Sequence, residues 1–305
     1  MSDREHELAV HPIPRWVGRL ARAQRPTAFE DLAAHDDIAP SPDGVTDTVV
    51  VAASPRTGSN LLVHTLRELG VGAGEEFWTE RMIWAGRARW GVPTIDTRGV
   101  LGQTKRALLR RERWWLSRSF DADQFLRYQR LLEQHRSTPD GVFVIKVFRL
   151  HLDQLERRNQ LSPIDVLPGR LHWVYQWRRD RVGQAISYLR ADATASWIDT
   201  DGTRTPTFDP DRLVDDDYAE LRRLVERFDR SDSWWRAWFD RHGVTPLEFE
   251  YEQLVGDLRS AVARVFESLG RPVPDDVVGA TVRQRDDAND EIRTRLLDRY
   301  PELDR

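Results

Sequence analysis

Cysteine is absent from the 305-residue sequence, so disulfide bonds and thiolate chemistry are excluded. The eight histidines show neither an HExxH pattern nor a pair at i, i+4, so we expect no protein-bound metal. No run of about 18 apolar residues occurs, and the N-terminus starts with acidic residues instead of the apolar core of a signal peptide. These absences predict a cytoplasmic protein without a membrane span.

Lysine is nearly absent as well, because Lys105 and Lys146 are its only occurrences in a chain with 46 lysines and arginines. The net charge of −4 and the pI of about 6.1 argue against a protein that coats nucleic acid or an anionic membrane. Any anion-binding site must therefore be local. We expect a small-molecule partner and no nucleic acid.

Residues 49–66 carry the most informative pattern in the chain. Residues 49–53 form a short apolar run typical of a buried central strand, and leucines follow at helical spacing from position 61. Between them lies a polar loop of turn formers and hydroxyls, residues 54–60. Such a junction presents backbone N–H groups and the positive end of a helix dipole to one point, and Gly58 leaves room for a close ligand. We therefore expect the loop to bind an anion such as a phosphate.

This loop is not a Walker A motif, because Arg56 precedes Gly58 and no Gly-Lys pair follows. Pro-Arg-Thr-Gly-Ser after a first strand instead resembles the 5′-phosphosulfate loop of sulfotransferases, whose donor is 3′-phosphoadenosine 5′-phosphosulfate (PAPS). On the loop alone, a polar turn without a ligand is the alternative. The resemblance implies donor contacts from Pro55, Arg56, Thr57, Gly58, Ser59 and Asn60. Asn60 departs from the usual Thr or Ser, although its amide can also donate.

A glycine-rich turn at residues 70–74 leads to Glu75 and Glu76, which two aromatic residues follow. Apolar neighbours raise the pKa of a glutamate toward neutral pH, so this place suits a general base. The motif resembles the bacterial trehalose 2-sulfotransferase family, in which the glutamate before the aromatic pair is the proposed base. The resemblance implies that Glu76 is the catalytic base and that Arg56 assists the leaving group. A solvent-exposed acidic turn is the alternative, and it suits Glu75 better.

Two further apolar runs, residues 142–148 and 171–177, predict buried strands. Lys146 lies inside the first run and needs a partner, and both a structural salt bridge and a donor contact remain open. Arg178 ends the second run, and Ser187 follows nine residues later on an expected helix, so both can approach one phosphate. This spacing resembles the sulfotransferase site for the 3′-phosphate of the donor; the alternative is a surface arginine and an ordinary helix residue.

Arginine and tryptophan alternate densely in residues 79–137. Such side chains suit a polar ring-shaped acceptor, such as a sugar or a hydroxylated natural product, and they also suit helix packing. The resembled family implies that this insertion shapes the acceptor pocket and contributes to a homodimer. It also implies that Arg283 and Gln284 close over the donor, with a solvated tail as the alternative. We expect acceptor contacts from Glu76, Phe77, Trp78, Trp84 and Arg190.

These patterns together predict an α/β fold with a P-loop NTPase-like central parallel sheet flanked by helices, the sulfotransferase fold. Residues 1–45 would form an N-terminal extension, and residues 46–305 a sulfotransferase domain with an acceptor-side insertion at about 79–137. Further elements are expected at 211–242, 257–270 and 272–282 as helices and at 246–251 as a strand. The expected activity is sulfuryl transfer from PAPS to an acceptor hydroxyl. The alternatives are a P-loop-type kinase and a non-catalytic nucleotide-binding or glycan-binding homologue.

Overall fold

The structure is a computed structural model that describes residues 37–91, 122–194, 197, 209–280 and 287–304. Its sheet consists of β1 (Asp47–Ala53), β2 (Val142–Phe148), β3 (Arg170–Trp177) and β4 (Leu247–Glu250). The strands run in the order β2-β1-β3-β4, and every pair is parallel. The predicted mixed α/β fold with a central parallel sheet is therefore confirmed.

β1 lies between β2 and β3, and the side chains of residues 49–53 are fully buried. This explains its uninterrupted run of small and β-branched apolar residues, because helices cover both faces of a central parallel strand. Ala53 pairs with Phe148 of β2 and with Gln176 of β3. The segments that follow these three strands therefore leave the sheet at the same edge.

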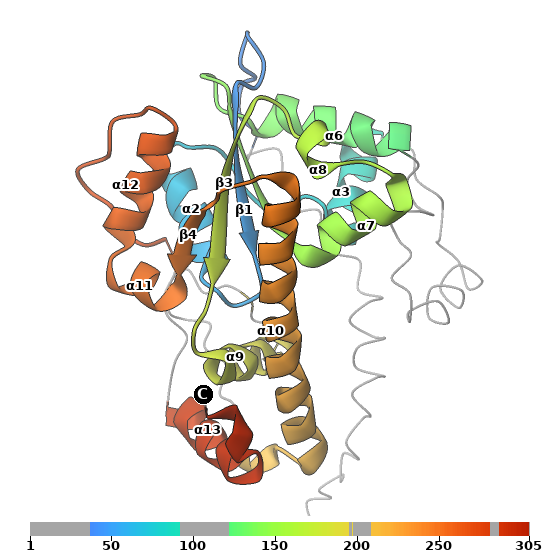
Figure 1. Cartoon of the computed structure of the whole chain (residues 1–305). Coiled ribbons are helices and arrows are strands. Elements are labelled where there is room, and N and C mark those ends of the chain that lie inside the picture. Colours follow the sequence, from blue (N-terminus) through green and yellow to red (C-terminus); the bar gives the residue numbers. More distant parts are fainter. Residues whose placement is uncertain (1–36, 92–121, 195–196, 198–208, 281–286, 305) are drawn as a thin grey trace, which may run out of the picture.

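Helices cover both faces of the sheet (Figure 1). On one face lie α2 (Ser59–Glu68), α11 (Tyr251–Gly256) and α12 (Leu258–Ser268). The opposite face is covered by α3 (Glu80–Trp90), α6 (Ala122–Arg136), α7 (Arg149–Asn159), α8 (Pro163–Val166) and the C-terminal half of α10 (Asp215–His242). The apolar side chains of each layer pack against the sheet and form two separate cores.

A third core lies beyond the carboxyl ends of the strands, where Figure 1 shows α9 (Arg181–Thr194) and α13 (Asp287–Arg299) beside the N-terminal half of α10. The short 3-10 turns η4 (Pro210–Arg212) and η5 (Pro301–Leu303) flank these helices. This helical layer therefore faces the edge of the sheet at which the parallel strands end.

The expected helix at residues 272–282 is wrong as far as the structure describes it, because residues 271–280 contain no helix. These residues are exposed or half-buried, and Val278 is 77% exposed, so a helix there would have no apolar face to bury. The insertion at 79–137 is described only at its ends, by α3 and α6. Its role and the boundary of the extension at residue 45 stay predictions.

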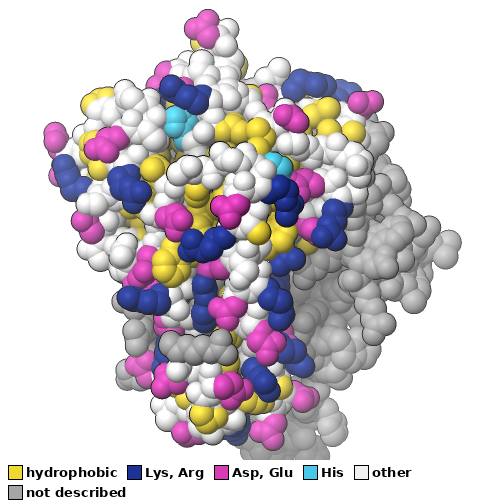
Figure 2. All heavy atoms as spheres, in the orientation of Figure 1, with side chains coloured by type: hydrophobic (Ala, Val, Ile, Leu, Met, Phe, Trp, Pro, Cys, Tyr) yellow, Lys and Arg dark blue, Asp and Glu magenta, His cyan; other side chains and the backbone are white. Residues whose placement is uncertain are grey.

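Cationic and anionic side chains alternate over the face shown in Figure 2. Within the described segments, no helix has the length and apolarity needed to cross a bilayer.

Candidate active site

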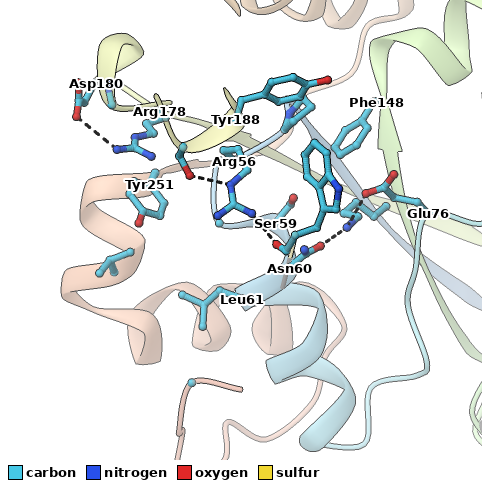
Figure 3. Close-up of a pocket in the computed structure, with 18 of the residues that line it drawn as sticks. Arg56, Ser59, Asn60, Leu61, Glu76, Phe148, Arg178, Asp180, Tyr188 and Tyr251 are labelled. Atoms are coloured by element: carbon cyan, nitrogen blue, oxygen red, sulfur yellow. Dashed lines mark hydrogen bonds and ion pairs between the residues drawn. The ribbon is translucent and has the colours of Figure 1, made fainter. Parts of the chain in front are cut away.

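A pocket of about 1100 Å³ opens at the carboxyl edge of the sheet. The loop after β1, the start of α9 and the start of α11 contribute to its wall (Figure 3). Among its lining residues are Pro55, Arg56, Gly58, Ser59, Asn60, Glu76, Lys146, Arg178 and Ser187. Both groups of residues expected to hold the donor, and the expected base, thus face one cavity.

The loop after β1 turns sharply before α2 begins at Ser59. Arg56 and Gly58 have left-handed backbone conformations, with φ of 67° and 79°. A Cβ on Gly58 would come within 3.0 Å of Tyr251 and 3.1 Å of Leu254, so glycine is needed for the close approach of α11. The first N–H groups of α2 have no partner within the helix, and they lie beside the pocket, where they suit an anion.

Thr57 differs from the other loop residues because its side chain does not face the pocket. It is fully buried, and its hydroxyl donates to the carbonyl oxygen of Ser54 at 2.9 Å. Only its backbone is in a position to contribute to an anion site. The sequence motif could not distinguish this residue from its neighbours.

Side chains from α9 and α10 fix the shape of the loop. The amide of Gln184 donates to the carbonyl of Pro55 at 2.8 Å, and the indole of Trp235 donates to the carbonyl of Ala53 at 3.2 Å. Arg181 in turn donates to the side-chain oxygen of Gln184 at 3.1 Å. Gln184 is fully buried, so the loop backbone is held by a rigid partner.

Arg56 joins the loop to α9, because its Nε donates to Oγ of Ser187 at 2.8 Å. Its Nη1 also donates to the carbonyl of Trp197 at 2.6 Å. Burial lowers the pKa of Arg56 to about 10; Tyr251 opposes this shift, whereas the charges of Arg178 and Arg190 add to it. Three guanidinium groups therefore repel one another at this point, and a bound anion would relieve the repulsion.

Arg178 follows β3 and lies over the ring of Tyr251, with 4.5 Å between Cζ and the ring centroid. Its Nη2 is 3.4 Å from Asp180, and its Nε is 3.7 Å from Glu252. Its side chain is only 12% exposed. The stacked ring and the flanking carboxylates hold the guanidinium at the end of the pocket away from Glu76 (Figure 3).

Glu76 is placed by the backbone of the preceding residue. Glu75 forms an isolated parallel bridge with Ile145, and its carbonyl accepts from the N–H of Lys146 at 3.0 Å. The next carboxylate then lies beside the same lysine, with 2.9 Å between Nζ of Lys146 and Oε1 of Glu76. The Glu76 side chain is 30% exposed and lines the pocket.

The expected acceptor contacts of Phe77 and Trp78 need a correction. Phe77 is fully buried and stacks on Phe143, and Trp78 is 1% exposed with its indole donating to Gln129 at 2.9 Å. Neither residue lines the pocket, so the two rings anchor the segment of Glu76 in the core instead. Aromatic residues beside a carboxylate fit both arrangements, and the sequence could not tell them apart.

Of the remaining expected contacts, the structure describes only the side chain of Arg190. Arg190 of α9 does not line the wall but donates to Oδ1 of Asn289, which does, at 2.5 Å. Trp84 belongs to α3, although its side chain is outside what the structure describes. Arg283 and Gln284 lie outside the described residues, so the lid over the donor stays a prediction.

Three residues that line or support the site carry no site role in the sequence-based prediction: Tyr251, Gln184 and His151. Tyr251 lies in the Tyr-Glu-Gln-Leu turn after the last strand, and this turn is the sequence feature that could have indicated its role beside Arg178. His151 lines the pocket, and its Nδ1 accepts from the N–H of Phe148 at 3.1 Å. Burial lowers the pKa of His151 to about 4, and Lys146 adds to this shift while Glu76 opposes it, so the ring is neutral at pH 7.

Chemically, the pocket combines an anion-binding helix start, clustered guanidinium groups and a carboxylate held by an ammonium. Among the residues that the structure describes, no three His, Cys, Asp or Glu side chains gather as a metal site would require. The arrangement suits a doubly anionic ligand that extends from the loop to Arg178.

Comparison with known proteins identifies the family. A family model described as Stf0 sulphotransferase matches residues 48–301. Trehalose 2-sulfotransferase of Mycolicibacterium smegmatis is 26% identical over 257 residues, which cover 78% of this chain and 91% of that protein. Trehalose 2-sulfotransferase of Mycobacterium tuberculosis is 25% identical over 233 residues, which cover 73% of this chain and 84% of that protein.

Among solved structures, the sulfotransferase domain from the Synechococcus PCC 7002 olefin synthase aligns with 18% identity and a TM-score of 0.35, over 82% of this chain and 79% of that chain. The family assignment rests on the sequence match, which includes the sheet apart from Asp47 and every described residue of the pocket wall. The chain therefore belongs to the Stf0 sulphotransferase family of transferases.

Proposed function

We propose that the protein transfers a sulfuryl group from PAPS to a hydroxyl group of a sugar or another polyhydroxylated acceptor. The observation that carries the proposal is the pocket itself. One cavity of about 1100 Å³ is lined by residues of the loop after β1, by Arg178 and Ser187, and by the carboxylate of Glu76. A volume of this order accommodates a nucleotide and part of a second ligand.

The residues present fit a nucleotide with phosphates at both ends. The helix start at Ser59 and the guanidinium of Arg56 would take the 5′-phosphosulfate. Arg178 and Ser187 would take the 3′-phosphate; Oγ of Ser187 accepts from Arg56, so its own O–H can donate to a phosphate oxygen. The pKa of Arg56 is lowered mainly by burial and further by the charges of Arg178 and Arg190, and a ligand of negative charge would stabilise the guanidinium against both effects.

Transfer would proceed in one in-line step. The acceptor oxygen forms a bond to sulfur while the bond between sulfur and the 5′-phosphate oxygen breaks, and the electron pair of that bond stays on the phosphate. Glu76 accepts the proton of the acceptor hydroxyl. Arg56 and the N–H groups of the loop stabilise the charge on the leaving phosphate, each oriented donor contributing about 3 kcal/mol. The products are a sulfate ester and 3′-phosphoadenosine 5′-phosphate, and the protonated Glu76 returns its proton to water.

The sequence of the loop separates this proposal from a kinase. A P-loop kinase uses a Gly-Lys pair to reach the β- and γ-phosphates, and Gly58 is followed by Ser59 here. A sulfuryl group carries less negative charge than a γ-phosphoryl group, so protein cations suffice to balance it. We therefore propose transfer that needs no metal ion.

The acceptor is proposed from the relatives and from the wall near Glu76. The two similar proteins are both trehalose 2-sulfotransferases. Polar groups of Thr79, His151 and Glu75 line the pocket beside Glu76 and suit hydroxyl groups of a sugar. Trehalose is thus the first acceptor to test; a cytoplasmic location and a homodimer stay predictions of the sequence.

The donor is tested by thermal unfolding with 3′-phosphoadenosine 5′-phosphate and, for comparison, with ATP and Mg²⁺. We expect 3′-phosphoadenosine 5′-phosphate to raise the unfolding temperature by several degrees, because a ligand that binds only the folded state stabilises it. A larger shift with ATP and Mg²⁺ would contradict the proposal and favour the kinase. Incubation with labelled PAPS and trehalose, or a panel of sugars, then tests transfer. Tight binding of 3′-phosphoadenosine 5′-phosphate without label transfer to any acceptor would indicate a non-catalytic homologue.

A further inference from the structure

The side chains around Lys146 form a closed arrangement that the transfer step described above does not use. Lys146 is 2% exposed and lies in β2, beside the central strand. A buried ammonium needs a partner for each of its three N–H groups, because an unsatisfied charge in the interior costs several kcal/mol. The position of these partners shows where the charge of Lys146 acts.

Three partners surround the ammonium. Oε1 of Glu76 lies 2.9 Å from Nζ, and Nζ also donates to Oδ1 of Asn60. The ring of Phe148 covers a further side, with 5.8 Å from Nζ to the ring centroid. The ammonium therefore has a carboxylate, an amide oxygen and an aromatic face around it at the wall of the pocket.

Asn60 has a second function in this arrangement. An ammonium only donates, so the branch of the Asn60 amide that faces Lys146 must be the oxygen. The other branch then carries two N–H donors, and Asn60 lines the pocket as the second residue of α2. One amide thus connects the anion loop, through Lys146, to the carboxylate of Glu76 (Figure 3).

We propose that Lys146 is a positioning residue that holds the carboxylate of Glu76 ionised and directed into the pocket, and that Asn60 fixes this ammonium to the donor loop. The inference rests on the proposed function, in which Glu76 accepts a proton. A serine or threonine at position 60 would be too short to support the lysine in the same way, so the asparagine gives this chain a specific link between donor loop and base.

The proposal separates two roles of Lys146 that predict opposite results. If Lys146 contacted the donor, Lys146→Met would weaken the binding of 3′-phosphoadenosine 5′-phosphate by a factor of about 10 or more, as the loss of a charged hydrogen bond does. If it positions Glu76, the dissociation constant measured by calorimetry should change by less than about threefold, while kcat falls. Strong loss of affinity would overturn the proposal.

The pH profile of kcat with PAPS and trehalose gives a second readout. Without the ammonium, the carboxylate of Glu76 takes up a proton at higher pH, so the acid limb of the profile should move up by about one pH unit or more in Lys146→Met. Lys146→Arg keeps a cation and should keep the limb near its wild-type position. A limb that stays in place in Lys146→Met would overturn the proposal.

Asn60→Ser is the matched variant that tests the hydrogen bond between Lys146 and Asn60. Its hydroxyl can still serve the donor, so affinity for 3′-phosphoadenosine 5′-phosphate should stay within about threefold. The acid limb should move in the same direction as in Lys146→Met, by a smaller amount. An unchanged acid limb of the kcat profile would show that Asn60 does not act on Glu76 through Lys146. Thermal unfolding of each variant reports whether the fold is intact.

A measurement without turnover distinguishes failure of this inference from failure of the proposed function. Carboxyl groups labelled with ¹³C-glutamate are titrated by NMR, and the signal of Glu76 is assigned by its loss in Glu76→Gln. Its midpoint should rise by about one pH unit or more in Lys146→Met, whether or not any sulfuryl transfer is found. An unchanged midpoint would contradict the role of Lys146 even in an active enzyme.

Discussion

Nε of Arg56 donates to Oγ of Ser187 across 2.8 Å, although the two residues are 131 positions apart in the sequence. The loop after β1 and helix α9 are thus in direct contact through two residues that both line the pocket. These are the segments expected to hold the two phosphates of one nucleotide. A ligand that touches both must extend across this contact, so substitutions at its two ends should affect different groups of the ligand.

Replacement of Glu76 by glutamine tests the base. Glu76→Gln should lower kcat by a factor of about 10² to 10⁴, the usual contribution of a general base, since an amide cannot accept the proton. Affinity for 3′-phosphoadenosine 5′-phosphate should change little. The measurement is kcat with labelled PAPS and trehalose, combined with calorimetry.

Glu75→Gln is the matched control, because it keeps the backbone bridge to Ile145 and removes a neighbouring charge, which lies 3.4 Å from Nε2 of His64. It should cost less than about tenfold in kcat. If Glu76→Gln keeps wild-type turnover, or if the two variants lose activity equally, another group is the base.

Replacement of Arg178 by alanine tests the 3′-phosphate site. Arg178→Ala should weaken 3′-phosphoadenosine 5′-phosphate by about 30-fold, since a charged hydrogen bond contributes about 2 kcal/mol. AMP lacks the 3′-phosphate, so its binding should change by less than about threefold. Arg179→Ala is the control, because that side chain is 71% exposed and pairs with Glu250. Equal losses for both nucleotides in Arg178→Ala would contradict the assignment.

Gly58 tests the shape of the loop. Gly58→Ala puts a Cβ against Tyr251 and Leu254 at a φ of 79°, so it should lower stability by about 1–3 kcal/mol and also weaken 3′-phosphoadenosine 5′-phosphate. Gly243→Ala has a comparable φ of 62° and no atom within 4 Å of the added Cβ. This control should lose stability alone. Chemical denaturation and calorimetry measure the two effects, and unchanged nucleotide affinity in Gly58→Ala would argue against a close ligand there.

How much of this site the sequence predicts depends on how far apart in the sequence the contacting residues lie. The apolar runs of β1 and β2 predict their strands within two residues, because a buried central strand needs continuous apolar side chains. The polar loop before α2 is also predicted, because the residue types that form a turn are adjacent in the sequence. The contact between Lys146 and Asn60 spans 86 positions, and no local pattern shows which acceptor a buried lysine reaches.

The aromatic residues near the site show the same limit of prediction from local sequence. Phe77 and Trp78 could face a sugar or the core, and the choice depends on α6, whose Gln129 accepts from the Trp78 indole. Tyr251 was visible as part of a turn, but only the packing of α11 against the loop reveals that its ring lies under Arg178. Local sequence therefore predicts the elements well, whereas the tertiary partners of each side chain come from the fold.

His151 predicts a pH-dependent stability. Burial holds its pKa at about 4, below the ordinary value of 6.5, so between these values the unfolded chain binds a proton that the folded chain does not. Stability should therefore be lost as the pH falls from about 6.5 toward 4, by on the order of 2–3 kcal/mol, and the group should have no effect above this window.

Urea denaturation at about pH 7 and about pH 4.5 measures this loss. His151→Asn keeps an acceptor for the N–H of Phe148 and removes the titration, so its stability should depend less on pH. His64→Asn should reduce the dependence as well, because burial also lowers the pKa of His64 to about 4. If His151→Asn is as sensitive to acid as the wild type, other groups cause the loss.

The order of the strands also has a consequence for synthesis on the ribosome. β1 is the centre of the sheet, yet its partners β2 and β3 begin only at Val142 and Arg170, far behind it in the chain. A nascent chain therefore carries an unpaired apolar strand until both partners have emerged, and pairing of distant strands is slow. Newly made protein should depend on chaperones during this interval, more than a chain whose strands pair in sequence order would.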